Sequence, residues 1–198
     1  MSRVKPLDPK DIPELMDVFE PVIERMGFIP NSQLVMAYKP DLLRAFINLG
    51  KAVYKEEEGS ISFQLKNLIG NMASQSAGCL YCIAHTSSNI ARSGIADEKV
   101  LAMWEFETSD LFSDAERAAL RFAQAAAQVP NMTTDEDFEE LRKHFTEFQI
   151  VEIMGVIAMF GYLNRWNDTM ATTLEDEPIE FAERTIAAAG WQPGKHAA

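Results

Sequence analysis

Apolar side chains recur along this chain at three- and four-residue intervals, and the alternating pattern of strands is nearly absent. Twelve Phe and ten Met suit the packing of helix against helix. We therefore predict an all-α protein. The expected helices cover approximately residues 13–27, 31–39, 41–55, 61–75, 78–93, 97–105, 113–128, 134–144, 147–172 and 178–189.

Residues suited to helix ends support these boundaries. Pro13 fits a first helical turn and Gly27 the position after a last turn. Glu116, three residues after a serine, predicts a capping box. The expected N-caps are Asn31 or Ser32, Asp97, Ser113 and Thr134.

The charge of the chain restricts its partners. A net charge of −12 argues against nucleic-acid and membrane-surface binding, because both need clusters of Lys and Arg. No secretory h-region is visible at the start, and the longest apolar run, at 150–163, is too short to span a bilayer. We expect a cytoplasmic protein.

Both cysteines lie in the stretch "SQSAGCLYCIAHT", as Cys79 and Cys82, with His85 three residues further on. Gly78 is expected to end one helix and place Cys79 at the start of the next, where free N–H groups and the helix dipole stabilise a thiolate. Two buried thiols or a zinc site are alternatives, but C-x2-C-x2-H offers only three of four ligands. We therefore predict a redox-active dithiol and expect neither a metal nor another cofactor.

A weak internal repeat relates residues 63–73 to residues 148–158 at an offset of 85, with Phe, Gln, Gly and Ala identical at four positions. The repeat suggests two similar helical halves. In the second copy, Asn164 and Asn167 occupy the positions of the two cysteines.

The segment "NLIGNMASQSAGCLYCIAHT", preceded by "GFIPNSQLVMAYKPDLLRAFINLGKAV" and followed by "FGYLNRW", resembles the carboxymuconolactone decarboxylase/alkyl hydroperoxidase D-like superfamily, in its peroxidase-related branch. The resemblance covers about residues 25–170. It implies a single AhpD-like helical domain over 1–198, with extensions at 1–24 and 174–198. It also implies a homo-oligomer that reduces hydrogen peroxide or alkyl hydroperoxides and is re-reduced by a lipoyl-type carrier protein or a small thiol.

The resemblance assigns roles to the two thiols. Cys82 corresponds to the peroxidatic thiol and Cys79 to the resolving thiol, with His85 helping to manage the proton. The helix dipole instead favours Cys79 as the more acidic thiol. We expect Cys82 to be the peroxidatic thiol, as the resemblance implies, because a neighbouring base can outweigh a dipole worth ~0.3–1 kcal/mol.

Two family positions are changed. Asn67 stands where the family has a Glu twelve residues before the first cysteine, and an amide cannot relay a proton as a carboxylate does. Thr86 stands where the best-known pattern has its relay histidine. Weak peroxidase activity is therefore expected.

For three other residues, we favour a structural role over a functional one. Glu152 takes the Asn67 position in the second copy, and we expect it to pair with a cation such as Arg165 or to face solvent; reaching the thiol site is the alternative. We expect Arg165 to be a structural anchor rather than a substrate-binding residue. We expect Tyr81 to be a packing residue rather than a proton donor. An acidic residue of loop 56–58 is a further substitute for the missing Glu.

Two other functions stay open. A decarboxylase-like lyase activity on a small lactone would not need both cysteines. A non-catalytic, redox-sensing helical oligomer would form the disulfide without turnover.

Overall fold

The computed structural model describes residues 2–197 and contains, within this range, only α-helices and short 3-10 helices, with no strand. The prediction of an all-α protein is confirmed. The α-helices are α1 (Met16–Met26), α2 (Asn31–Met36), α3 (Pro40–Val53), α4 (Phe63–Ala77), α5 (Leu80–Arg92), α6 (Asp97–Leu101), α7 (Asp114–Ala126), α8 (Asp135–Arg142), α9 (Glu147–Met170) and α10 (Asp176–Thr185). In this range, none is long and apolar enough to cross a membrane.

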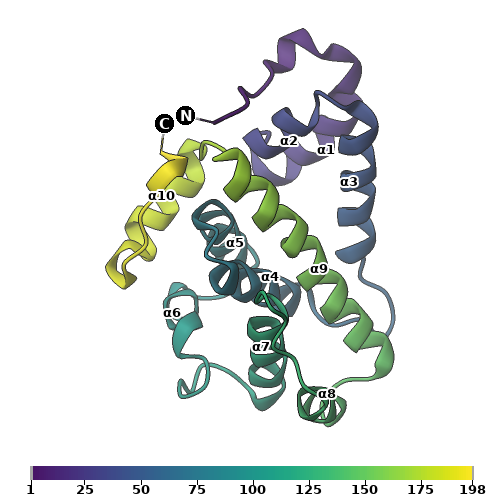
Figure 1. Ribbon diagram of the computed structural model, residues 1–198, viewed down its shortest axis with the longest axis vertical. Coiled ribbons are helices and arrows are strands. Elements are labelled where there is room, and N and C mark those ends of the chain that lie inside the picture. Colours follow the sequence, from purple (N-terminus) through teal and green to yellow (C-terminus); the bar gives the residue numbers. More distant parts are fainter. Residues whose placement is uncertain (1, 198) are drawn as a thin grey trace.

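The long helix α9 separates the N-terminal helices α1–α3 from a group formed by α4, α5 and α7 (Figure 1). Helix α4 packs against α5, α7 and α9 and forms the centre of the fold. Its Gly70 lies against the ring of Phe160, where a Cβ atom would come within 2.4 Å of the ring. The missing side chain thus lets α4 and α9 approach closely.

Two hydrophobic clusters form the core. The smaller one joins α1–α3 and contains the fully buried Phe19 and Leu43. The larger one surrounds α4 and includes both cysteines. Phe46 and Leu163 pack against both clusters, so the two parts of the core are continuous.

Helix ends follow the sequence signals in part. Ser113 and Thr134 form capping boxes, and Gly27 ends α1 with φ +83°. Asp97 is not a cap, because Ala96 takes that position and Asp97 lies in the first turn. The Asn31 or Ser32 cap was also wrong, since Pro30 precedes α2 and the Asn31 amide donates instead to the Thr173 carbonyl.

Several boundaries differ from the expected ones. The region 97–105 is α6 followed by a 3-10 helix, Ala102–Glu105. Helix α10 begins and ends earlier than expected, and the 3-10 helix Ala187–Ala189 follows it. Helix α9 is continuous, whereas its repeat counterpart breaks between α4 and α5 at Gly78, with φ +69°. Leu163, at the corresponding position of α9, continues the helix.

The C-terminal segment, residues 171–197, packs over the beginning of α5. Trp191 Nε1 donates to the Leu80 carbonyl over 3.1 Å, and Leu174 N donates to the His196 carbonyl. The first described residues lie beside the same region (Figure 1), where Ser2 hydrogen-bonds to Thr173. The start of the described chain and the C-terminal segment therefore meet at Thr173.

Candidate functional site: a buried cysteine pair beside a Glu–His–Tyr cluster

The cysteine pair lies at the start of α5. Gly78 leaves α4 in the left-handed conformation, and Cys79 is the N-cap residue of α5, as predicted. Cys82 lies on the first turn of the helix. Both are free thiols, and only 0% and 3% of the two residues is exposed. The fold therefore places two thiols on one turn and covers both.

The surroundings of the two sulfurs differ in their effect on charge. Hydrogen bonding from the Cys82 thiol, helped by the backbone N–H groups of Cys82 and Tyr81, lowers the pKa of Cys79 against the effect of burial. Burial and the Cys79 neighbour raise the pKa of Cys82 well above its usual value. Cys79 is therefore the more acidic of the two thiols, which agrees with the argument from the helix dipole.

One side chain of α9 contacts the second sulfur. Asn167 Nδ2 lies 3.4 Å from Cys82 Sγ and donates to it. Asn167 is itself buried. The two residues that correspond in the weak repeat are thus direct neighbours.

A carboxylate joins two side chains on one face of α5. Glu175 Oε1 accepts from the Tyr81 hydroxyl over 2.9 Å, and Glu175 Oε2 lies 2.7 Å from His85 Nε2. The Asn31 backbone N–H also donates to this carboxylate. Burial raises the pKa of Glu175, but the charge of His85 and these hydrogen bonds outweigh it, so that the pKa is lowered.

The sequence prediction did not include Glu175. It lies at the N-cap position of α10, in the C-terminal extension beyond the matching region, within the acidic stretch "LEDEPIE". Such a stretch reads as a solvated helix start. Only the packing of α10 against α5 brings its carboxylate to His85.

The other expected residues of α4 and α5 take structural contacts. Asn67 is buried and donates to the Phe63 carbonyl of its own helix. Thr86 donates to the Cys82 carbonyl and accepts from Asn71. Among residues 2–197, no hydrogen bond joins His85 to either sulfur.

The structure does not bring Glu152 to the cysteines. Its carboxylate lies 2.8 Å from Nζ of the fully buried Lys66 and accepts from the Ile61 N–H. Pairing with a cation was expected, but the partner is Lys66 rather than Arg165. Arg165 is exposed and donates to the Gly161 carbonyl. The acidic loop likewise stays apart, because Glu56 accepts from Phe63 N and Glu57 pairs with Lys55.

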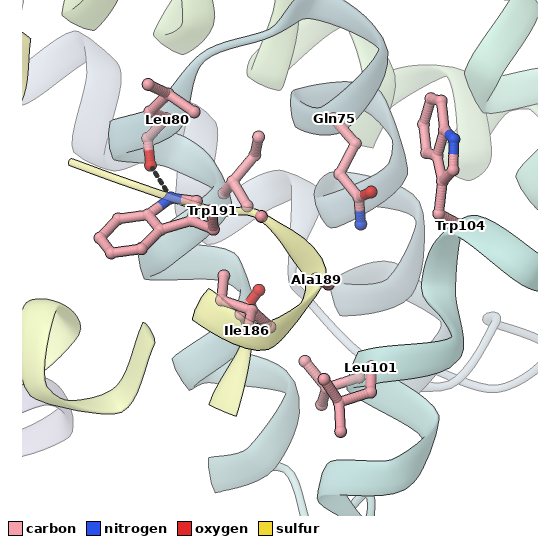
Figure 2. Close-up of a pocket in the computed structure, with 11 residues that line it drawn as sticks. Gln75, Leu80, Leu101, Trp104, Ile186, Ala189 and Trp191 are labelled. Carbon is pink, nitrogen blue, oxygen red and sulfur yellow. Dashed lines mark hydrogen bonds between the residues drawn. The ribbon is translucent and has the colours of Figure 1, made fainter. Parts of the chain in front are cut away.

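A cleft of about 320 Å³ lies between α5, α6 and the C-terminal segment. Figure 2 shows Trp191, hydrogen-bonded to Leu80, on one side of the cleft and Trp104 on the other. Apolar side chains form most of its wall, with Gln75 and Ser87 among the polar ones. Neither cysteine lines it, so the cleft lies beside the thiol pair rather than at it. In the described part of the chain, no group of three or more His, Cys, Asp or Glu side chains could hold a metal ion.

The fold and the site together define an all-α protein with a buried dithiol at a helix N-terminus. The chain belongs to the carboxymuconolactone decarboxylase family, whose pattern it matches over residues 40–125. Among solved structures it is similar to the debrominase Bmp8, determined also as a cysteine-to-alanine variant with 2,3,4-tribromopyrrole. The identity to that variant is 38% over 92% of this chain and 96% of the other, with a TM-score of 0.84.

Two further relatives carry names without a defined reaction. An uncharacterized peroxidase-related protein with an alkylhydroperoxidase AhpD core, from Ralstonia eutropha JMP134, is 25% identical over 91% of this chain and 95% of that one, with a TM-score of 0.80. The uncharacterized protein YnjA of Escherichia coli K12 is 30% identical over 106 residues. That match covers 54% of this chain and 58% of YnjA. The AhpD-like helical fold is therefore shown.

Proposed function

We propose that this protein is a dithiol oxidoreductase in which Cys82 attacks an electrophilic substrate and Cys79 then closes a Cys79–Cys82 disulfide. The observation that supports it most directly is the pair itself, with two buried free thiols on one helical turn and unequal pKa values. The first substrate class is hydrogen peroxide or an alkyl hydroperoxide.

The unequal pKa values suggest how the reaction starts. In the proposed first step the Cys79 thiolate accepts the proton of Cys82 as the Cys82 sulfur attacks the O–O bond. The products are a sulfenic acid on Cys82 and an alcohol or water. The Cys79 thiol then displaces water from the sulfenic acid and forms the disulfide.

His85 supplies the proton that the leaving oxygen needs. Glu175 lies 2.7 Å from its Nε2 atom and orients the ring, a common arrangement for a general acid. The Tyr81 hydroxyl orients the same carboxylate. The cluster thereby takes the place of the family carboxylate that Asn67 replaces.

The cycle needs no cofactor besides the cysteine pair. A lipoyl-type carrier protein or a small thiol would reduce the disulfide, in a reducing compartment such as the cytoplasm. We also propose a homo-oligomer, since α9 exposes the apolar residues Phe148, Val151 and Met154 at three-residue spacing.

Reductive dehalogenation of a small aromatic halide is the second candidate, because a debrominase is 38% identical over nearly the whole chain. The two thiols can supply the two electrons that this reduction needs. An aryl bromide and two thiols give the arene, bromide, a proton and the disulfide. The apolar cleft beside α5 has the size of a small-molecule site.

One experiment distinguishes the candidates. The reduced protein is mixed with hydrogen peroxide, cumene hydroperoxide or 2,3,4-tribromopyrrole, and the Cys79–Cys82 disulfide is followed by mass spectrometry. Peroxide-dependent disulfide formation supports a peroxidase, and stoichiometric bromide release supports a dehalogenase. Disulfide formation with none of the three contradicts the proposal.

The roles of the two thiols are tested separately with single variants. Cys79→Ser is expected to form a sulfenic acid that dimedone traps at Cys82, while Cys82→Ser forms none. Trapping only in Cys82→Ser would reverse the assignment.

A further inference from the structure

The side-chain amide of Asn167 is buried and contacts the sulfur of Cys82. Its Nδ2 atom donates to Cys82 Sγ over 3.4 Å, while its Oδ1 atom has no hydrogen-bond partner within the described chain. Buried amides normally satisfy their oxygen, and leaving it unpaired costs free energy. Within the described chain, the Cys82 sulfur is therefore the hydrogen-bond partner of this side-chain amide.

Asn164, one turn earlier on α9, provides a comparison within the same helix. It is also buried, but its Nδ2 atom donates to the Ala73 carbonyl of α4 over 3.3 Å. That bond joins two helices and involves no reacting atom. The Oδ1 atom of Asn164 is likewise unpaired within the described chain, so the two amides differ in the group that their Nδ2 atoms contact.

We propose that Asn167 is a catalytic residue, which stabilises the negative charge that develops on the Cys82 sulfur as its proton moves to Cys79. This inference rests on the dithiol function proposed above. An N–H···S bond to a neutral thiol is weak, and it strengthens when the sulfur becomes charged, as charge-assisted hydrogen bonds do. Asn167 therefore favours the attacking state over the resting state.

The other groups around Cys82 act in the opposite direction. Burial, Cys79 and Asp168 raise the pKa of Cys82, whereas the hydrogen bond from Asn167 lowers it. His85, one turn further along α5, is paired with Glu175 rather than with this sulfur. Asn167 is thus the side-chain donor that faces Cys82 from α9.

The test is a titration of the Cys82 thiolate in a Cys79→Ser background, by ultraviolet absorbance and by the pH dependence of iodoacetamide alkylation. Asn167→Leu keeps a similar volume and removes the donor. We expect the midpoint to rise by about one pH unit, with alkylation about tenfold slower at neutral pH. Asn164→Leu is the matched control and should leave the midpoint unchanged.

An unchanged midpoint in folded Asn167→Leu would overturn the inference, as would an equal shift in Asn164→Leu. If Asn167→Leu does not fold, Asn167→Ala is measured in the same way with Asn164→Ala as control. The readout uses neither a peroxide nor an organohalide. A failure of the proposed function therefore leaves this result interpretable, and a failure here leaves the disulfide assay unaffected.

Discussion

At the scale of single residues, Glu175 organises two side chains of the same helix. Tyr81 and His85 are four positions apart on α5, so they share a face, and each contacts one oxygen of the carboxylate. Burial raises the pKa of Tyr81, which keeps its hydroxyl protonated as a donor. A charged carboxylate at this position thus fixes the imidazole next to the dithiol.

Replacing Glu175 by Gln preserves shape and removes the charge. We expect disulfide formation with the substrate to slow by about tenfold to a hundredfold, because His85 loses the carboxylate that orients its ring. Glu177→Gln is the matched control, since Glu177 contacts Ser88 and Arg92 of α5 but not His85. Equal losses in stopped-flow measurements on both variants would contradict the assignment.

The same carboxylate also makes stability depend on pH. The pKa of Glu175 is lower in the folded protein than its usual value of 4.5. Its contribution to the free energy of unfolding is therefore complete above about pH 4.5 and is lost as the pH falls below the folded value. Urea unfolding at about pH 7 and about pH 3 should show the stability difference between the wild type and Glu175→Gln shrinking on acidification. A difference that grows would contradict this sign.

At the scale of elements, α4 and α9 are close neighbours that tolerate different side chains at their two repeat-related glycines. A Cβ at Gly70 would meet the Phe160 ring at 2.4 Å, whereas a Cβ at Gly155 would have only Val53 at 3.9 Å. Both glycines lie inside helices with ordinary backbone angles. Their difference is therefore one of packing.

Replacing each glycine by alanine should give opposite results. Gly70→Ala should destabilise the protein by ~1–3 kcal/mol, because the ring of Phe160 must move within a packed core. Gly155→Ala should be neutral or stabilising by up to ~1 kcal/mol, since alanine is the better helix former. Chemical denaturation of both variants measures the change in the free energy of unfolding that each substitution causes. Similar destabilisation of both would contradict the close approach of α4 to α9 at Gly70.

The sequence predicted the helices well because their apolar periodicity and capping residues are local signals. Gly78 and the C-x2-C spacing likewise placed Cys79 at the start of α5. Contacts between side chains that lie far apart in the sequence could not be predicted from such local signals. Glu175 reaches His85 only through packing of α10 on α5, and Glu152 finds Lys66 rather than Arg165 for the same reason.

At the scale of the whole molecule, the C-terminal segment covers the turn that carries the dithiol. Trp191 binds the Leu80 carbonyl between the two cysteine positions, and His196 binds the Thr172 carbonyl. Trp104, across the cleft, is mostly exposed and does not touch Leu80 in this way (Figure 2). Trp191 therefore covers the turn that carries the cysteines, whereas Trp104 only lines the cleft. Variants of the two residues can distinguish these two roles.

Removing the Trp191 side chain should make the thiols easier to reach. Trp191→Ala is expected to react about tenfold faster with a bulky aromatic disulfide, because local opening of the segment becomes easier by ~1.4 kcal/mol or more. Trp104→Ala should react at the wild-type rate. Circular dichroism confirms that both variants remain folded. Equal rates for wild type and Trp191→Ala would show that access to the thiols follows another route.

The near-complete burial of both sulfurs also selects among reductants by their shape. With 0% and 3% of Cys79 and Cys82 exposed, we expect a slender lipoyl-type arm to reach the disulfide more readily than a dithiol presented on the broad surface of a folded protein. A small thiol, the other donor proposed above, would likewise have to wait for the C-terminal segment to open before it could exchange with the disulfide. The lifetime of the oxidised form would then be set by how often the C-terminal segment opens, whichever donor reduces it.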